Sequence, residues 1–234
     1  MLNFSRIEQD VMEVHPFAWK FIDQLFSPAD AAALAASFPR DHFKKVTGHD
    51  GEKSYAYWSR SLIHMGASTA TYAEALSPAW AALAKDLLSP DYRKSLSRLT
   101  GRDLASCDLE VNAIHYGPGA WLGPHLDLKE KIATHVLYFN ESWNPADGGC
   151  IRILNSSNPE DVAAEIPPIV GGSSLLVRSE SSWHMVSKVK GDCRLSRRSL
   201  NVIFHQAGSA STMWPPGDLA PLADFDEAAS LGPA

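Results

Sequence analysis

Cysteine is scarce in this chain. It occurs three times among 234 residues, at Cys107, Cys150 and Cys193, and no two of these positions form a C-x-x-C pair. An odd number of widely separated cysteines predicts neither a disulfide framework nor a zinc knuckle. The pattern fits a reduced, cytoplasmic setting.

Long apolar runs and basic runs are lacking too. The first ten residues contain no apolar signal core, and no stretch approaches the length of a membrane-spanning helix. A formal net charge of −6, without any run rich in lysine and arginine, disfavours nucleic acid as a partner. We therefore expect a small-molecule substrate and neither nucleic acid nor membrane as partner, while the oligomeric state stays open.

The composition that is present is ordinary for a globular domain. The chain is 45% hydrophobic and 21% charged, and it is long enough for one domain with a core. Residues 1–105 are predicted to be mainly helix and loop. The sequence Ser27-Pro28-Ala29-Asp30 begins a helix, because serine caps it, proline suits the first helical position and aspartate favours the positive helix end. Pro39 ends this helix.

Two further helices are predicted before residue 105. The run 69–88 is rich in alanine and leucine, and a second helix begins at 89–90 and ends at Gly101. Residues 43–66 are expected to form short strands or a loop over a site. This stretch carries a cluster of aromatic residues, Tyr55, Tyr57 and Trp58, for which core packing is a commoner role than substrate contact.

The pattern changes from Leu104 onward to short strands bounded by glycine, proline and asparagine. The predicted strands are 109–116, 134–139, 150–154, 173–177, 184–186 and 199–204. This spacing is typical of an antiparallel sandwich or barrel, so the fold class is mainly β with supporting N-terminal helices, a jelly roll. We expect a single domain in which 1–105 support a core at 106–206, followed by a tail at 207–234 whose end is frayed.

The most informative stretch ends in His125-x-Asp127. In an extended segment, residues two apart point to the same side, so both side chains can reach one ion. An isolated pair of this kind also occurs on surfaces, so a third ligand is needed, and His184 is the candidate. A jelly roll brings such distant strand ends together at one mouth. Two histidines and one carboxylate form the facial triad of non-haem Fe(II) oxygenases.

A basic stretch follows at residues 194–199. A 2-oxoglutarate cosubstrate needs a cation for its distal carboxylate, and arginine binds carboxylates in a bidentate manner. Arg197 and Ser199 share one face of the predicted strand with Asn201. Arg198 is the alternative anchor, because a slip of one residue exchanges the faces.

In its second half the chain resembles the Fe(II)/2-oxoglutarate-dependent oxygenases, in particular their prolyl-4-hydroxylase-like branch. The resemblance covers about 109–204 and weakens before that. It rests on an ordered set of motifs: Tyr116-Gly-Pro-Gly, His125-Leu-Asp127, Leu137-Tyr138-Phe139-Asn140 followed by Trp143, Gly148-Gly149-Cys-Ile-Arg-Ile, His184-Met-Val and Arg197-Arg-Ser-Leu-Asn-Val.

The resemblance implies a double-stranded β-helix and a set of roles. His125, Asp127 and His184 would bind Fe(II), and Arg197 would pair with the 2-oxoglutarate carboxylate beside Ser199. Tyr138 would donate its phenol to the same carboxylate, and Tyr116 would lie near the cosubstrate or the substrate. The resemblance further implies dioxygen as co-reactant and ascorbate as a stimulant.

Other positions leave alternatives open. Related halogenases lack the carboxylate of the triad, so Asp127 favours hydroxylation or another oxidation over halogenation. Arg178 could face a substrate carboxylate or reach solvent, and solvent is the favoured of the two. The glycines at 148–149 are expected to serve a tight turn or bulge. Three histidines without ligand companions are expected to be structural: His115, His135 and His205.

The sequence thus predicts an Fe(II)- and 2-oxoglutarate-dependent dioxygenase that hydroxylates a small molecule, such as an amino acid or a biosynthetic intermediate. Desaturation and cyclisation remain open. The alternatives are a protein side-chain (prolyl-type) hydroxylase and a cupin-like metal-binding protein without oxygenase activity. Hydrolytic zinc chemistry ranks last, because no H-E-x-x-H motif is present.

Overall fold

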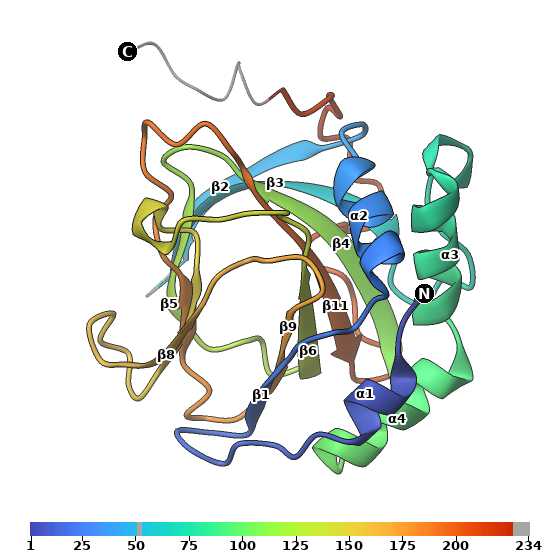
Figure 1. Cartoon of the computed structure of the whole chain (residues 1–234), viewed down its shortest axis with the longest axis horizontal. Coiled ribbons are helices and arrows are strands. Elements are labelled where there is room, and N and C mark those ends of the chain that lie inside the picture. Colours follow the sequence, from blue (N-terminus) through green and yellow to red (C-terminus); the bar gives the residue numbers. More distant parts are fainter. Residues whose placement is uncertain (51–52, 227–234) are drawn as a thin grey trace.

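A strongly curved antiparallel sheet forms most of the molecule, with four α-helices packed along one side (Figure 1). The computed structural model describes residues 1–50 and 53–226. Neighbouring strands pair in the order β1-β9-β6-β11-β4-β3-β5-β10-β7-β8. Strand β2 lies off this path and pairs with β3. This arrangement is the nearly closed jelly roll, or double-stranded β-helix, that the sequence predicted.

The elements follow one another along the chain with these bounds. They are α1 (Phe4–Glu8), β1 (Trp19–Ile22), α2 (Pro28–Ala36), β2 (Lys44–Asp50), β3 (Lys53–Ile63), η1 (Ala73–Ala75), α3 (Pro78–Leu87), α4 (Pro90–Thr100), β4 (Asp108–Tyr116), β5 (Trp121–His125), β6 (Lys131–Tyr138), η2 (Pro145–Asp147), β7 (Ile151–Leu154), β8 (Val162–Ile166), β9 (Ser173–Val177), β10 (His184–Val186) and β11 (Arg197–His205).

Strand β11 is central, because it pairs with both β4 and β6. Its register places Arg197 opposite Tyr116 and Ser199 opposite Tyr138. Alternate residues of a strand face opposite sides of the sheet. Leu200 therefore lies on the face of β11 that packs in the hydrophobic core against the helices, which we call the helix-side core. Arg197 lies on the opposite face and lines the cavity inside the barrel.

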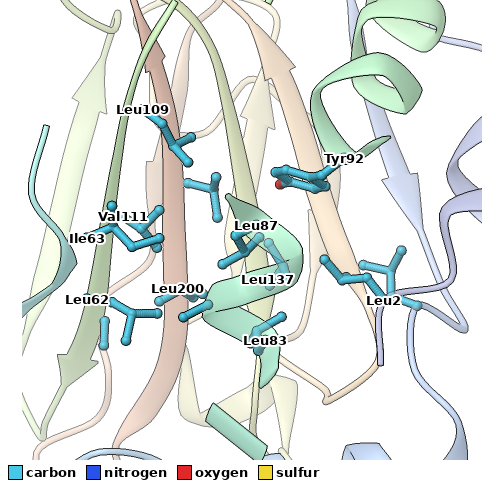
Figure 2. Packing of buried hydrophobic residues seen from close by; sticks show 14 of the residues in the cluster. Leu2, Leu62, Ile63, Leu83, Leu87, Tyr92, Leu109, Val111, Leu137 and Leu200 are labelled. Atoms are coloured by element: carbon cyan, nitrogen blue, oxygen red, sulfur yellow. The ribbon is translucent and has the colours of Figure 1, made fainter. Parts of the chain in front are cut away.

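The helices cover the outer face of these central strands. In Figure 2, Leu83 and Leu87 of α3 lie against Leu137 of β6 and Leu200 of β11. All four side chains are fully buried. Burial of a leucine side chain contributes about 1.5–3 kcal/mol, so this layer holds the outer face rigid and leaves the inner face available for polar groups.

Two expectations for the first part of the chain are wrong. The run 69–88 is helical only at 73–75 and from Pro78, because Ser77 caps the helix and Pro78 occupies its first turn. The preceding Tyr72 has a positive φ of 52° and stacks on His42, so the chain turns there. The strand β1 was not expected either, whereas β2 and β3 lie within 43–66, where short strands or a loop over a site were expected.

Other helix limits agree with the sequence. Ser27 accepts a hydrogen bond from the Asp30 backbone N–H, and α2 ends shortly before Pro39. Gly101 adopts a positive φ of 66° after α4. Two strands, β5 and β8, lay outside the predicted set. All three cysteines are buried free thiols.

The structure describes the tail from Ala207 as far as Asp226, and the end of the tail at 227–234, where fraying was expected, lies outside the described residues. The Phe225 side chain is buried and stacks on His115, with ring centroids 3.9 Å apart. The Lys44 ammonium pairs with Asp218 and also donates to the Met213 carbonyl. We call residues 209–222 the C-terminal strap. It is held at both ends, by these contacts and by side-chain hydrogen bonds to β4.

A buried histidine makes stability depend on pH. Burial lowers the pKa of His135 to about 3, and its neutral ring lies between Tyr92 and Ser173. In the unfolded chain this histidine takes up a proton near its ordinary pKa, so unfolding is favoured as the pH falls below that value. We expect His135 to account for about 2 kcal/mol of the stability lost between about pH 7 and about pH 5.

Urea unfolding across this pH range checks the expectation. His135→Gln should flatten the pH dependence, whereas His15→Gln, at an exposed histidine, should leave it unchanged. If the free energy of unfolding falls equally with decreasing pH in the wild type and in His135→Gln, the His135 ring does not cause the loss of stability in acid.

Candidate active site

Three side chains meet where β5 and β10 lie side by side. His125 ends β5 and is paired in register with His184, the first residue of β10, and Asp127 follows β5. One ligand atom from each of the three residues lies within 4.8 Å of the others. The two imidazole rings have centroids 4.2 Å apart. This is the only such cluster of three or more metal-ligating residues in the described part of the chain.

Backbone contacts orient both imidazoles. Nδ1 of His125 donates to the Gly123 carbonyl and Nδ1 of His184 to the Ser182 carbonyl, each over 2.9 Å. Since a carbonyl only accepts, each ring carries its proton on Nδ1 and its lone pair on Nε2. Such outer contacts fix the tautomer that a metal ligand requires.

The carboxylate of Asp127 is held from both sides. Lys131 Nζ lies 2.6 Å from Oδ1, and the Thr134 hydroxyl donates to Oδ2 over 2.8 Å. Burial would raise the pKa of Asp127, but the Lys131 ammonium and the two imidazoles outweigh it and hold that pKa well below its usual range. Two imidazoles and one ionised carboxylate suit Fe(II), so the donor set fits the metal that the triad implies.

Arg197 lies in the same cavity without a counterion. Its side chain is 1% exposed, and its guanidinium donates to the Ser199 hydroxyl over 2.6 Å. Its Nε has no hydrogen-bond partner, and no carboxylate of residues 1–50 and 53–226 forms an ion pair with it. A buried cation without a partner is costly, so this position favours an anionic ligand.

Two tyrosines flank the Arg197 guanidinium. It lies 5.0 Å from the Tyr116 ring centroid and 5.6 Å from that of Tyr138. Burial raises the pKa of both phenols to about 12, although the arginine charge opposes it. Both phenols are therefore protonated near neutral pH, and the Tyr138 hydroxyl donates to Ser174 over 2.6 Å. The Arg197 guanidinium and Tyr116 line the cavity and suit a carboxylate, whereas Tyr138 and Ser199 lie behind the lining, where their hydroxyls contact Ser174 and Arg197.

The part of the cavity beyond the triad is also polar. Glu110 accepts from His205 Nε2 over 3.1 Å and from the Ser211 hydroxyl over 2.6 Å. Burial would raise the pKa of Glu110, but these hydrogen bonds and the charges of His205 and Lys131 outweigh it and lower that pKa. A carboxylate thus lies in the same cavity as the triad. The cavity volume is 110 Å³, and Thr212 and Met213 of the strap line it.

The structure separates Arg197 from its sequence alternative. Arg197 lines the cavity with Asn201, whereas the cavity lining does not include Arg198. Arg178 is also absent from that lining and pairs with Glu180 over 2.6 Å. At Gly148 a Cβ would lie 1.9 Å from the Lys188 carbonyl oxygen, so glycine serves a tight turn there.

The histidines without ligand companions divide into two groups. His115 contacts Ser196 and the Pro39 carbonyl, and His135 lies in the helix-side core, which agrees with structural roles. His205 instead lines the cavity, although a structural role was expected.

The aromatic cluster divides in a similar way. Tyr57 lines the cavity, while Trp58 packs against Phe225 with ring centroids 6.0 Å apart.

Sequence reasoning missed Glu110 and Lys131. Glu110 lies in a predicted strand, whereas Lys131 begins β6, three residues before the predicted strand at 134–139. Neither belongs to a motif, and the pairing of β4 and β6 with β11 brings both to the cavity. The inward alternation of β4, with Glu110 and Asn112 on the face of Tyr116, was the available signal.

Comparisons with known proteins agree with this geometry. Residues 111–205 match the family model described as the 2OG-Fe(II) oxygenase superfamily. A comparison with curated proteins found no match. No helix among the described residues combines the length and apolar character needed to cross a membrane.

Solved structures share the fold at low sequence identity. A prolyl-4-hydroxylase from Pseudomonas putida has a TM-score of 0.56 at 21% identity, over 80% of this chain and 92% of that chain. A 2OG-Fe(II) oxygenase family oxidoreductase from Burkholderia pseudomallei has a TM-score of 0.55 at 15% identity, over 87% and 91%. AviO1 from Streptomyces viridochromogenes has a TM-score of 0.52 at 11% identity, over 90% and 98%.

Proposed function

We propose that this chain, whose residues 111–205 match the 2OG-Fe(II) oxygenase superfamily model, is a 2-oxoglutarate-dependent oxygenase that hydroxylates a small molecule. The observation that carries the proposal is the pairing of two features in one cavity. A buried His/Asp/His triad lies beside a buried arginine that forms no ion pair with an acidic group of residues 1–50 and 53–226.

Each residue has a separate task in this proposal. His125, Asp127 and His184 would hold Fe(II), and Lys131 and Thr134 keep the carboxylate ionised and oriented. When bound, Fe(II) and 2-oxoglutarate supply the redox chemistry by which dioxygen is reduced, 2-oxoglutarate becomes succinate and CO2, and a substrate C–H bond becomes C–OH.

The other end of the cosubstrate would be held by this chain's own cations and hydroxyls. Arg197 and Ser199 would bind the distal carboxylate of 2-oxoglutarate, and the protonated phenols of Tyr138 and Tyr116 would complete its pocket. Burial of these groups excludes water, which strengthens each charge-assisted hydrogen bond.

A small substrate is supported by the enclosure of the cavity. Its volume of 110 Å³ and the strap residues Thr212 and Met213 at its wall limit the space beside the triad. Prolyl-type hydroxylation of a protein side chain is the alternative, since one solved relative is a prolyl hydroxylase in complex with a peptide fragment (TM-score 0.50, 16% identity).

Succinate formation with Fe(II), 2-oxoglutarate and oxygen tests the proposal. A metabolite collection and a set of proline-containing peptides should be assayed in parallel, and we expect stimulation by a metabolite. Stimulation by peptides alone would replace the small-molecule assignment with the alternative. Failure of the anaerobic protein to give a visible charge-transfer band with Fe(II) and 2-oxoglutarate would refute the cofactor assignment.

A further inference from the structure

One donor in the active cavity has no partner. The Asn112 side chain is 1% exposed, and its Oδ1 accepts from the indole N–H of Trp214 over 2.7 Å. Because the indole nitrogen only donates, this bond fixes which end of the amide is oxygen. The amide nitrogen Nδ2 is left buried without a hydrogen-bond partner, in a residue that lines the cavity. A buried unsatisfied donor costs about 1–3 kcal/mol, so the position favours a ligand with an acceptor.

Two opposite charges lie near this donor. Glu110 is 2% exposed, and Lys131 is mostly buried with one of its three N–H groups directed at Asp127. Within the described residues no ion pair joins Glu110 to Lys131, although the Lys131 charge contributes to lowering the pKa of Glu110. The cavity therefore offers a carboxylate and an ammonium that do not neutralise each other by contact.

The charges of the remaining groups cancel once metal and cosubstrate are present. Fe²⁺ with Asp127 and Arg197 balances the two negative charges of 2-oxoglutarate. The other formal charges in the cavity lining are the negative charge of Glu110, which contacts His205, and the positive charge of Lys131, which contacts Asp127. A substrate with a net charge would leave that charge buried and uncompensated, at a cost of several kcal/mol. A substrate with both charges and no net charge is the best match.

We propose that Glu110, Asn112 and Lys131 form a subsite for a free amino acid or a similar small zwitterion, which is thereby the substrate class of the enzyme. Glu110 binds the ammonium group, while Lys131 and the Asn112 amide bind the carboxylate. The inference rests on the proposed function, since it names the substrate of that same site. An internal peptide segment lacks both backbone charges and would leave Glu110 and Lys131 without a charged ligand group.

The test measures binding to the anaerobic protein with Fe(II) and 2-oxoglutarate. Each standard protein amino acid is added in turn, and its binding is followed by calorimetry and by the shift of the charge-transfer band. We expect at least one to bind, and N-acetylation or methyl esterification of that amino acid to weaken binding about 10-fold or more, since each removes one charge.

Two variants connect the effect to the named residues. Glu110→Gln keeps an acceptor for Ser211 and should weaken binding of the amino acid about 30-fold, with little further effect on its N-acetyl derivative. Asn112→Asp should weaken it by a similar factor through repulsion of the carboxylate. Both should retain metal and 2-oxoglutarate binding, and Glu141→Gln, at an exposed site, should behave as the wild type.

The outcomes separate the two proposals. If the charge-transfer band forms and no amino acid binds, or if the bound amino acid tolerates acetylation and Glu110→Gln, the subsite is refuted while the cofactor assignment stands. If the band does not form, the proposed function fails. Calorimetry with Mn(II)-loaded protein then still decides whether amino acids bind at Glu110.

Discussion

Alanine at Asp127 or at His184 is expected to reduce substrate-dependent succinate formation by about 100-fold or more, because each variant removes one of three metal ligands. His184 lies in register with His125, and its loss leaves two of the three clustered ligands, His125 and Asp127. The second readout is Mn(II) affinity by calorimetry, which should fall in parallel with activity. Asp127→Ala also leaves the buried Lys131 ammonium without its partner.

The control for this pair is Asp192→Ala, at an exposed aspartate in the loop before β11. It should retain both activity and metal affinity. Full activity in both ligand variants would remove the triad from the mechanism. Lost activity with unchanged Mn(II) affinity would mean that the residues act on substrate and not on metal.

Arg197→Met should raise the KM for 2-oxoglutarate by about 30-fold or more, because it removes the one cation that lies between the two tyrosines. Arg197→Lys keeps the charge but loses the planar fork, so an intermediate KM is expected. Mn(II) affinity should change little in both variants, since Arg197 is not among the clustered ligands. Initial rates of succinate formation at varied 2-oxoglutarate give the KM values.

Arg198 provides a matched comparison on the same strand. Successive residues of β11 face opposite sides of the sheet, and the cavity lining contains Arg197 without Arg198. Arg198→Met should therefore leave the KM for 2-oxoglutarate within about 2-fold of the wild type. A larger increase in Arg198→Met than in Arg197→Met would exchange the roles of the two arginines.

The fold class was predictable because its strongest signals are local. Ser27-Pro28 and Ser89-Pro90 mark helix starts that the structure confirms, and the strand at 184–186 was located at its observed bounds. The run 69–88 failed because its alanine and leucine content suits a helix throughout, while the turn near Tyr72 depends on a tertiary contact with His42. Composition alone cannot show such a contact.

The candidate site was predictable only in part, for a related reason. The triad and Arg197 occur in an ordered set of motifs, so each supports the interpretation of the others. Glu110 and Lys131 have no motif, and their meeting depends on how β4, β11 and β6 are paired. The burial of Phe225 and its stacking on His115 are tertiary contacts that the glycine, serine and proline content of the tail does not predict.

The strap also has a consequence for substrate selectivity. Ser211 and Trp214, which contact Glu110 and Asn112, lie outside the segment 111–205 that matches the superfamily, as does Glu110 itself. Asn112 and Lys131 of the proposed subsite lie within that segment together with the triad, whereas Glu110 and the strap residues that contact the subsite lie outside it. On this proposal, substitutions at Ser211 or Trp214 are expected to change substrate selectivity while the triad stays intact.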